Sequence, residues 1–236
     1  MIIATNINKK FGKLQALDNI SVTCNKGQCI ALIGPNGSGK TTFIKCLLGM
    51  VVADSGFITF NGKNISKDCS YRSDIGYMPQ TGRFPDNMTI AQIFDMMKDI
   101  RKKTNSRIDD ELIYLFGLDS LLDKRMRTLS GGTRQKVGAC LAFLFNPAVL
   151  ILDEPTAGLD PVSTEILKEK IAKEKANGKL ILITSHVLSD MDEMVSEVLY
   201  LNEGKLLFHQ PFQQLQESTG EQRLSKAIAS IMKKNT

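Results

Sequence analysis

The sequence has few cysteines and histidines, the residues that bind zinc or, for cysteine, cross-link a chain. Its five cysteines form no Cys-x-x-Cys pair and no cluster with the two histidines. We therefore expect neither a zinc site nor a disulfide framework, and reduced thiols of a cytoplasmic protein are the simpler account. The cysteines are Cys24, Cys29, Cys46, Cys69 and Cys140.

Long apolar runs and a secretion signal are also missing. The longest apolar runs fall short of the roughly 20 residues of a membrane-spanning helix, and residues 1–6 carry no basic region or apolar core segment. We therefore expect a cytoplasmic protein, and the chain is long enough for a single domain over residues 1–236. The net charge of +5 is small and spread over both signs, so no nucleic-acid partner is expected.

What the sequence does contain is a phosphate-binding loop. Residues 34–41 have a glycine, four further residues and then Gly-Lys-Thr. The apolar run 29–33 predicts a strand before the loop, and the spacing over 42–48 predicts a helix after it. Backbone N–H groups there can surround phosphate oxygens at the positive end of the helix dipole. The predicted nucleotide-binding residues of this segment are Gly34, Pro35, Asn36, Gly37, Ser38, Gly39, Lys40, Thr41 and Thr42.

Two side chains distinguish this loop from an ordinary glycine-rich turn. We expect Lys40 to reach the β- and γ-phosphates and the Thr41 hydroxyl to ligate magnesium. A turn that binds nothing would need neither group.

Two adjacent carboxylates follow a second apolar strand, predicted over residues 148–152. Asp153 and Glu154 stand at its carboxyl end, where α/β sheets place their ligands. We expect Asp153 to hold magnesium and Glu154 to polarise a water for attack on the γ-phosphate. Acids that merely end a buried strand are the alternative, but unpaired charges near a core are costly.

Two more predicted strands end in candidate site residues. The strand over residues 75–80 is ended by Pro79 and leaves Gln80 at its edge, where the amide can meet magnesium or a water. The strand over residues 180–183 leads to His186, for which a γ-phosphate contact is the interpretation that we favour over a surface or core histidine.

Short strands also precede and follow the phosphate loop. Alternating residues over 2–7 and 19–24 predict antiparallel strands, with Phe11 in the link between them. Residues 56–60, followed by Asn61 and Gly62, predict a hairpin. Together these strands predict a small antiparallel β region beside the nucleotide core.

Residues 85–145 are predicted to be mostly helical, as a subdomain inserted into the α/β core. Thr89 and Gln92 have the spacing of a capping box. Ser130, Gly131 and Gly132 precede another helix and form a second candidate anion site, for which a plain helix cap is the alternative.

The C-terminal tail, residues 220–236, predicts an amphipathic helix. Its apolar stripe consists of Leu224, Ala227, Ile228 and Ile231. The stripe requires a surface, either on its own domain or on a partner protein.

Taken in their order along the chain, the motifs resemble those of the ATP-binding-cassette ATPases, the nucleotide-binding domains of ABC transporters. The resemblance covers residues 11–208 and implies an α/β fold: a P-loop nucleoside triphosphatase core with the β region and helical insertion described above. It also implies that Phe11 stacks on adenine, that residues 129–133 are the signature motif, and that Asp160 belongs to the D-loop. Gln80 and His186 match the Q-loop glutamine and the switch histidine.

Two residues depart from the family pattern. Thr133 replaces the glutamine that ends the signature, which affects fine contacts and not ATP binding. Phe11 replaces a more usual tyrosine, and stacking needs only an aromatic face.

The resemblance further implies ATP and Mg²⁺ as cofactors and a second ATPase subunit, in a homodimer or a heterodimer that closes head to tail. It also implies an integral membrane permease that docks on the helical insertion near Gln80. The protein would then lie at the inner face of the cell membrane.

A second resemblance is to ATPases of nitrous-oxide reductase maturation, which serve copper-site assembly. It is carried by residues 184–188, the segment from Leu129 to Lys136 and the short tail. The paired methionines Met96, Met97, Met191 and Met194 nevertheless favour core packing over copper binding.

Two other functions remain open at this point. The same cassette serves non-transport ATPases in DNA repair or on ribosomes, although these usually carry long coiled coils or two cassettes. A nucleotide-sensing module without turnover would be expected to lack Glu154 or His186, and this sequence has both.

Overall fold

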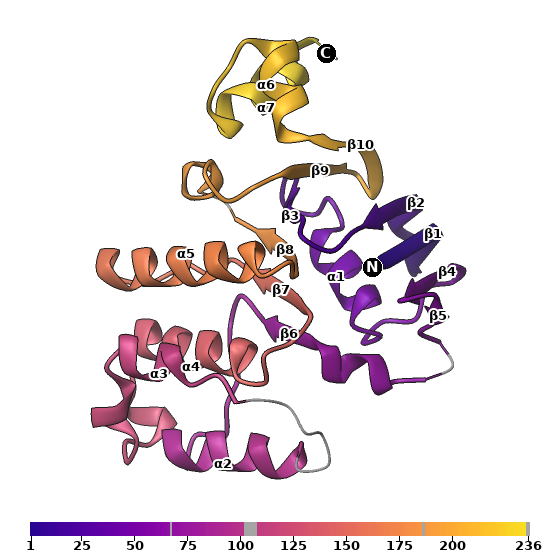
Figure 1. Cartoon of the computed structure of the whole chain (residues 1–236). Coiled ribbons are helices and arrows are strands. Elements are labelled where there is room, and N and C mark those ends of the chain that lie inside the picture. Colours follow the sequence, from indigo (N-terminus) through magenta and orange to yellow (C-terminus); the bar gives the residue numbers. More distant parts are fainter. Residues whose placement is uncertain (67, 102–107, 186, 235–236) are drawn as a thin grey trace.

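Two β-sheets and a group of helices make up the protein (Figure 1). The structure is a computed structural model that describes residues 1–66, 68–101, 108–185 and 187–234. Its six-stranded sheet has the order β10-β9-β3-β8-β7-β6, in which β9, β3, β8, β7 and β6 are parallel and β10 pairs antiparallel with β9. These strands are β3 (Cys29–Ile33), β6 (Ile75–Met78), β7 (Val149–Asp153), β8 (Leu180–Thr184), β9 (Glu197–Asn202) and β10 (Lys205–Pro211).

The central strands of this sheet are buried along their whole length. Every residue of β3, β7 and β8 is buried. Strands covered on both faces are nearly all apolar, which is why these segments read as apolar runs in the sequence, broken only at the last residues of β7 and β8, Asp153 and Thr184. The predicted strands over residues 75–80, 148–152 and 180–183 are confirmed, with small differences at their ends. β9 and β10 were not predicted.

The second sheet is antiparallel, with the order β2-β1-β4-β5. Its strands are β1 (Ile2–Phe11), β2 (Leu14–Cys24), β4 (Ser55–Phe60) and β5 (Lys63–Asn64). The predicted hairpin is confirmed, since Asn61 and Gly62 both have positive φ between β4 and β5. The placement of Phe11 in a link was wrong, because Phe11 is the last residue of β1. Register shifts between Ala4 and Lys10 interrupt the alternation that would have shown the full length of the strand.

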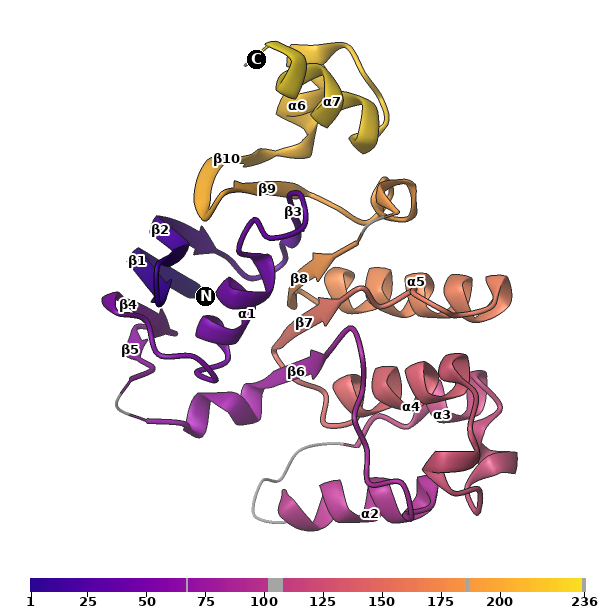
Figure 2. The same cartoon turned by 180° about the vertical axis from the view of Figure 1, so that it is seen from behind.

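Helix α1 (Lys40–Leu47) joins the two sheets through one hydrophobic core. Its buried residues Phe43, Ile44 and Leu47 belong to a cluster that also contains Ile7 of β1 and Ile30 of β3. The phosphate loop lies between β3 and α1 and is therefore held from both sides. Figure 2 shows α1 between the antiparallel sheet and the parallel strands.

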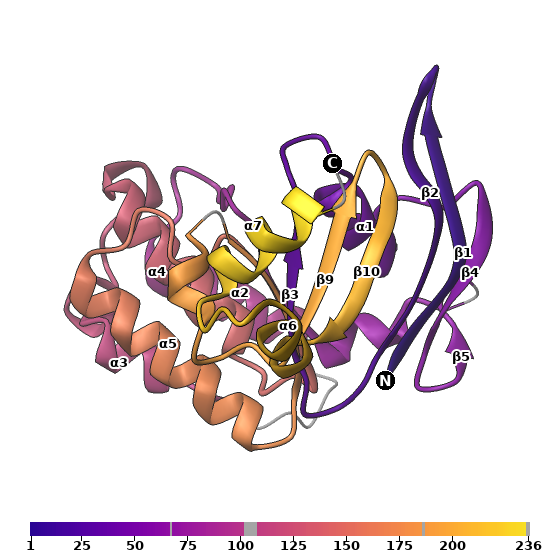
Figure 3. The ribbon, with the colours of Figure 1, turned by 90° about the horizontal axis from the view of Figure 1, so that it is seen from above.

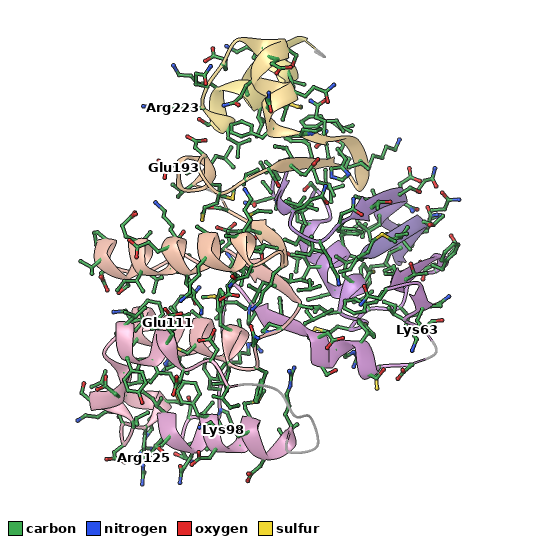
Figure 4. All side chains as sticks on the ribbon, viewed as in Figure 1. Lys63, Lys98, Glu111, Arg125, Glu193 and Arg223 are labelled. Carbon is green, nitrogen blue, oxygen red and sulfur yellow. The ribbon has the colours of Figure 1, made fainter. Side chains whose placement is uncertain are left out.

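The remaining helices before the tail pack mainly on the opposite face of the parallel sheet from α1, where α4 (Gly131–Phe143) and α5 (Pro161–Ala176) share a core with alternate residues of β3, β7 and β8. α2 (Ile90–Ile100), α3 (Glu111–Leu115) and α4 lie between β6 and β7 in the chain, with the short 3-10 segments Leu118–Leu121 and Met126–Thr128. The capping box of Thr89 and Gln92 is confirmed at the start of α2. α5 follows β7, and Glu111 lies on the side of α3 that faces it (Figure 4).

The tail folds back on its own domain. α6 (Phe212–Thr219) follows β10, and α7 (Leu224–Lys234) packs beside it (Figure 3). Leu224, Ala227 and Ile228 are buried in the main core, and the Leu224 N–H donates to Asp192 Oδ1 over 2.8 Å. Asp192 directly follows the 3-10 segment Leu188–Met191, so the tail contacts the chain shortly after β8. Of the two expected surfaces, the protein's own domain is the one observed.

We predict that Leu224→Ala destabilises the protein by about 2–5 kcal/mol, because it leaves a cavity at a fully buried site. Lys226→Ala, on the exposed face of α7, is the matched control and should change stability by less than about 0.5 kcal/mol. Chemical denaturation of both variants measures the difference. Equal stability of the two variants would show that the tail packing contributes nothing.

Candidate functional site

The phosphate loop is shaped by glycines at positions where a side chain cannot fit. Gly34 has φ 152°, and a Cβ atom there would overlap the carbonyl oxygen of Leu201. Gly39 has φ 102° at the start of α1, and its Cβ would lie 2.5 Å from the carbonyl oxygen of Ala16. Both positions need a left-handed backbone and close approach to another strand or loop, which only glycine permits. The loop is therefore held in a narrow turn around the amino end of α1.

Lys40 lies at the centre of this turn. Its Nζ donates to the carbonyl oxygens of Gly34, over 2.7 Å, and Pro35, over 3.0 Å. Burial lowers the pKa of the Lys40 ammonium, while the negative charges of Glu154 and Asp153 oppose this shift. These two acceptors are neutral carbonyl groups, so an anion in the adjoining pocket would gain a charge-assisted contact with the ammonium.

Ser38 gives independent evidence that the loop fits a polar ligand. The side chain is 1% exposed, and among the described residues its hydroxyl has no hydrogen-bond partner. Buried hydroxyl groups are nearly always paired in folded proteins. Since Ser38 lines the pocket beside Lys40, a phosphate oxygen there would satisfy the hydroxyl. The residues present therefore fit a nucleotide.

The two carboxylates lie where β7 ends and are both buried, with Asp153 7% and Glu154 8% exposed. Asp153 Oδ1 accepts a 2.6 Å hydrogen bond from the Thr184 hydroxyl of β8. Glu154 has φ 54°, in the left-handed region that residues other than glycine seldom adopt. Its N–H donates to the Thr184 hydroxyl over 3.0 Å and to the Thr184 carbonyl oxygen over 3.2 Å.

The negative charge of Asp153 affects Tyr77 on the neighbouring strand β6. Burial raises the pKa of Tyr77 on β6, and Asp153 adds to the shift. Gln135 of α4 also contacts this turn, since its Nε2 donates to the Glu154 carbonyl oxygen over 3.3 Å. The turn is thus held by residues from β8 and from the helical insertion.

A pocket of about 430 Å³ gathers most of the predicted site residues. Phe11, at the end of β1, is 49% exposed at this pocket, and the Lys9 ammonium lies 5.4 Å from its ring centre. An exposed aromatic face at this place is available to stack on a base. The pocket is lined by Phe11, Leu14, Ala16, Asn36, Gly37, Ser38, Gly39, Lys40, Thr41, Thr42, Gln80, Asp153 and Glu154.

Gly34 and Pro35 of the loop do not line this pocket, and four further predicted residues, Ser130, Gly131, Gly132 and Asp160, form a second cluster away from it. Ser130 caps α4 by accepting from the Thr133 N–H over 3.2 Å, and the Thr133 hydroxyl lies 2.9 Å from Ser130 Oγ. Gly131 is exposed and Gly132 half-buried, and a Cβ on Gly132 would lie 2.7 Å from the carbonyl oxygen of Gly158. The threonine that replaces the family's glutamine therefore completes the cap of its own helix.

Asp160 connects this cluster to α5. It caps α5 by accepting from the Ser163 N–H over 2.9 Å, and it pairs with Lys136 of α4 at 2.9 Å. Hydrogen bonds from the Ser163 hydroxyl and N–H and from Lys136 lower the pKa of Asp160. The first half of α4 thus lies beside the amino end of α5.

One predicted residue, His186, lies outside the described residues. Sequence reasoning missed two others, Thr184 and Gln135, which hold the carboxylate turn. The sequence could have pointed to Thr184. Parallel strands end at a common edge of the sheet, and Thr184 ends β8 as Asp153 ends β7. The two residues are register partners in the sheet.

A family model described as ABC transporter matches residues 17–157. The chain belongs to the ABC transporter family. It is an ABC ATPase domain, and ATP hydrolysis is the general activity of this family. The P-loop core, the antiparallel sheet and the helices found here are those of ABC ATPase cassettes, so the predicted fold class is confirmed.

Individual relatives agree with this assignment. The chain is 32% identical to the lantibiotic transport ATP-binding protein SrtF of Streptococcus pyogenes, over 90% of this chain and 91% of that protein. It is 31% identical to the Nod factor export ATP-binding protein I of Ralstonia nicotianae, over 84% of this chain, and spans 63% of the length of that protein. A solved structure, the ATP binding subunit of an ABC transporter, superposes with a TM-score of 0.90 at 25% identity, over 98% of this chain and 99% of that chain.

The relatives named here do not support a role in nitrous-oxide reductase maturation. No group of three or more His, Cys, Asp or Glu side chains in the described ranges is arranged to hold a metal ion. Met191 and Met194 are buried in the core, and Met96 and Met97 pack against it, as predicted. Within the same ranges, none of the helices has the length and apolar character needed to cross a bilayer.

We predict that Lys40→Ala weakens ATP binding by about tenfold or more, since a charge-assisted hydrogen bond contributes roughly 1.5–3 kcal/mol. Isothermal titration calorimetry with Mg²⁺ and ATP measures the change. Lys45→Ala is the matched control, because Lys45 is exposed on the same helix and does not line the pocket. Equal affinity of the two variants would contradict the role of Lys40.

Proposed function

We propose that this protein is the ATP-hydrolysing subunit of an ABC transporter and powers a separate membrane permease. The observation that carries the proposal is the single pocket that contains the phosphate loop, Gln80, Asp153, Glu154 and an exposed aromatic side chain. A module that only senses nucleotide has no need for Glu154 in this pocket. The relatives reported above are named for transport, which favours a transporter over a repair or ribosomal ATPase.

The proposed roles follow from the geometry of the pocket. The N–H groups of the loop and the Lys40 ammonium hold the β- and γ-phosphates of ATP. Thr41, Asp153 and Gln80 would hold Mg²⁺, which neutralises charge on the phosphoryl group when bound. Phe11 stacks on the adenine. All five side chains named for these roles line the pocket.

Glu154 is the proposed general base, which orients the attacking water and accepts its proton. Its backbone is fixed by two hydrogen bonds to Thr184 and by Gln135. A base held in place before the reaction avoids the cost of reorganisation during it. The proposed contact of His186 with the γ-phosphate rests on its position in the sequence after β8.

A second subunit is proposed because the signature cluster lies outside the pocket. Ser130, Gly131 and Gly132 present a capped helix start, and Gly131 is exposed. In one subunit this anion site has no phosphate to bind. In a head-to-tail dimer, the signature of each subunit would cover the γ-phosphate in the pocket of the other, and Asp160 would lie beside it.

The permease is proposed to dock beside Gln80. A second pocket, of about 350 Å³, lies between β6 and α2 and is lined by apolar residues that include Phe84, Ile93 and Met97. It adjoins the loop that carries Gln80, so a partner bound there can sense the state of the nucleotide pocket through that loop. The protein would then lie on the inner face of the membrane as a peripheral subunit.

We predict that Glu154→Gln keeps ATP affinity but lowers turnover by about 10²–10⁴-fold, because the amide cannot accept the proton of water. Steady-state hydrolysis and calorimetry separate the two effects. Glu169→Gln, on the exposed face of α5, removes the same charge away from the pocket and should hydrolyse ATP like the parent. Turnover by Glu154→Gln at the rate of this control would exclude Glu154 as the base.

We also predict that Ser130→Arg leaves ATP affinity of the monomer nearly unchanged but blocks ATP-dependent dimerisation, because the larger side chain fills the gap meant for phosphate. Light scattering on a Glu154→Gln background reports the dimer without turnover. Ser225→Arg, exposed on α7, is the control for added charge and bulk. If Ser130→Arg dimerises as well as this control, the signature segment is only a helix cap.

A further inference from the structure

A single hydroxyl group joins the two carboxylate residues of the site. Thr184 ends β8 and is 0% exposed. Its Oγ1 donates to Asp153 Oδ1 over 2.6 Å and accepts from the Glu154 N–H over 3.0 Å. Both bonds cross from β8 to the end of β7, where Thr184 and Asp153 are register partners.

The first bond fixes the orientation of a carboxylate. Asp153 lines the nucleotide pocket and is 7% exposed. A carboxylate can rotate about its terminal torsion, which has broad energy wells. Because Oδ1 is bonded to a fully buried hydroxyl, this rotation is restricted and the position of Oδ2 is fixed as well.

The second bond fixes a backbone turn. Glu154 has φ 54° and is 8% exposed, so its N–H needs a partner inside the protein. Thr184 supplies it through both the hydroxyl and the carbonyl oxygen. The direction in which the Glu154 side chain leaves the turn depends on this unusual backbone conformation, which persists only when its surroundings hold it.

We propose that Thr184 is a positioning residue, whose hydroxyl sets the metal-binding carboxylate of Asp153 and the water-orienting Glu154 together. This inference rests on the proposed function of the pocket. Thr184 does not itself line the pocket, so it acts through the two residues that do. A hydroxyl that served only as a hydrogen-bond partner for buried groups would affect the stability of the protein and not the response of the site to Mg²⁺.

Thr184→Val tests the proposal, because valine keeps the shape of threonine and removes the hydroxyl. Turnover should fall by about 10–100-fold, the size of effect expected from a misplacement of about 1 Å. The affinity for ADP without Mg²⁺ should stay unchanged, while the gain in ADP affinity on adding Mg²⁺ should shrink at least about threefold. Thr184→Ser keeps the hydroxyl and should restore both measurements.

A binding measurement and a second set of variants ensure that the experiment decides the role of Thr184. ADP binding with and without Mg²⁺ needs no hydrolysis, so this measurement tests Thr184 independently of turnover. If the protein does not hydrolyse ATP at all, that result overturns the proposed function but not the role of Thr184. If Thr184→Val folds poorly, Thr184→Ala and Thr184→Cys, measured at low temperature, replace it. Parent-like turnover and Mg²⁺ response in a folded variant without the hydroxyl would overturn the role of Thr184 while leaving that of Glu154 intact.

Discussion

The parallel pairing of β3, β8 and β7 is the constraint on which the site depends. Parallel strands end at a common edge, so the phosphate loop after β3, Thr184 at the end of β8 and Asp153 at the end of β7 are brought together although they are far apart in the chain. Crevices at the carboxyl ends of such strands are where α/β sheets bind ligands. A slip of one residue in the β7–β8 register would turn the side chain of Asp153 to the opposite face.

The pocket brings one ammonium and two carboxylates into a buried environment. Burial lowers the pKa of Lys40, and Glu154 and Asp153 partly counter it. Charges removed from water are costly unless they are paired or hydrogen-bonded. The bonds of Lys40 to the loop carbonyls and of Asp153 to Thr184 offset part of this cost before any ligand binds. A nucleotide with Mg²⁺ would complete the charge pairing, so the site is arranged for a ligand rather than for its own stability.

Much of the fold and of the nucleotide pocket was predictable because the signals are local. The phosphate loop, the apolar strand before Asp153 and the capping box of α2 each lie within a short stretch of sequence, and the pattern there directly reflects the structure. Phe11 was misplaced because bulges in β1 break the alternation of the strand. Thr184 was missed since its role comes from pairing between β7 and β8, which no single segment contains.

The signature turn and Asp160 keep their relative position because ion pairs join α5 both to α4 and to the start of α3. Lys136, in the first half of α4, pairs with Asp160 at the amino end of α5. Near the other end Lys170 of α5, which is 4% exposed, pairs with Asp109 at 2.6 Å and Glu111 at 2.7 Å from the helical insertion. Burial opposes the charge of Lys170, but its carboxylate partners raise its pKa. Because buried ion pairs add little net stability and yet are costly to break, we infer that these contacts fix geometry. Within one subunit, these contacts keep the start of α4 and Asp160 in a single arrangement.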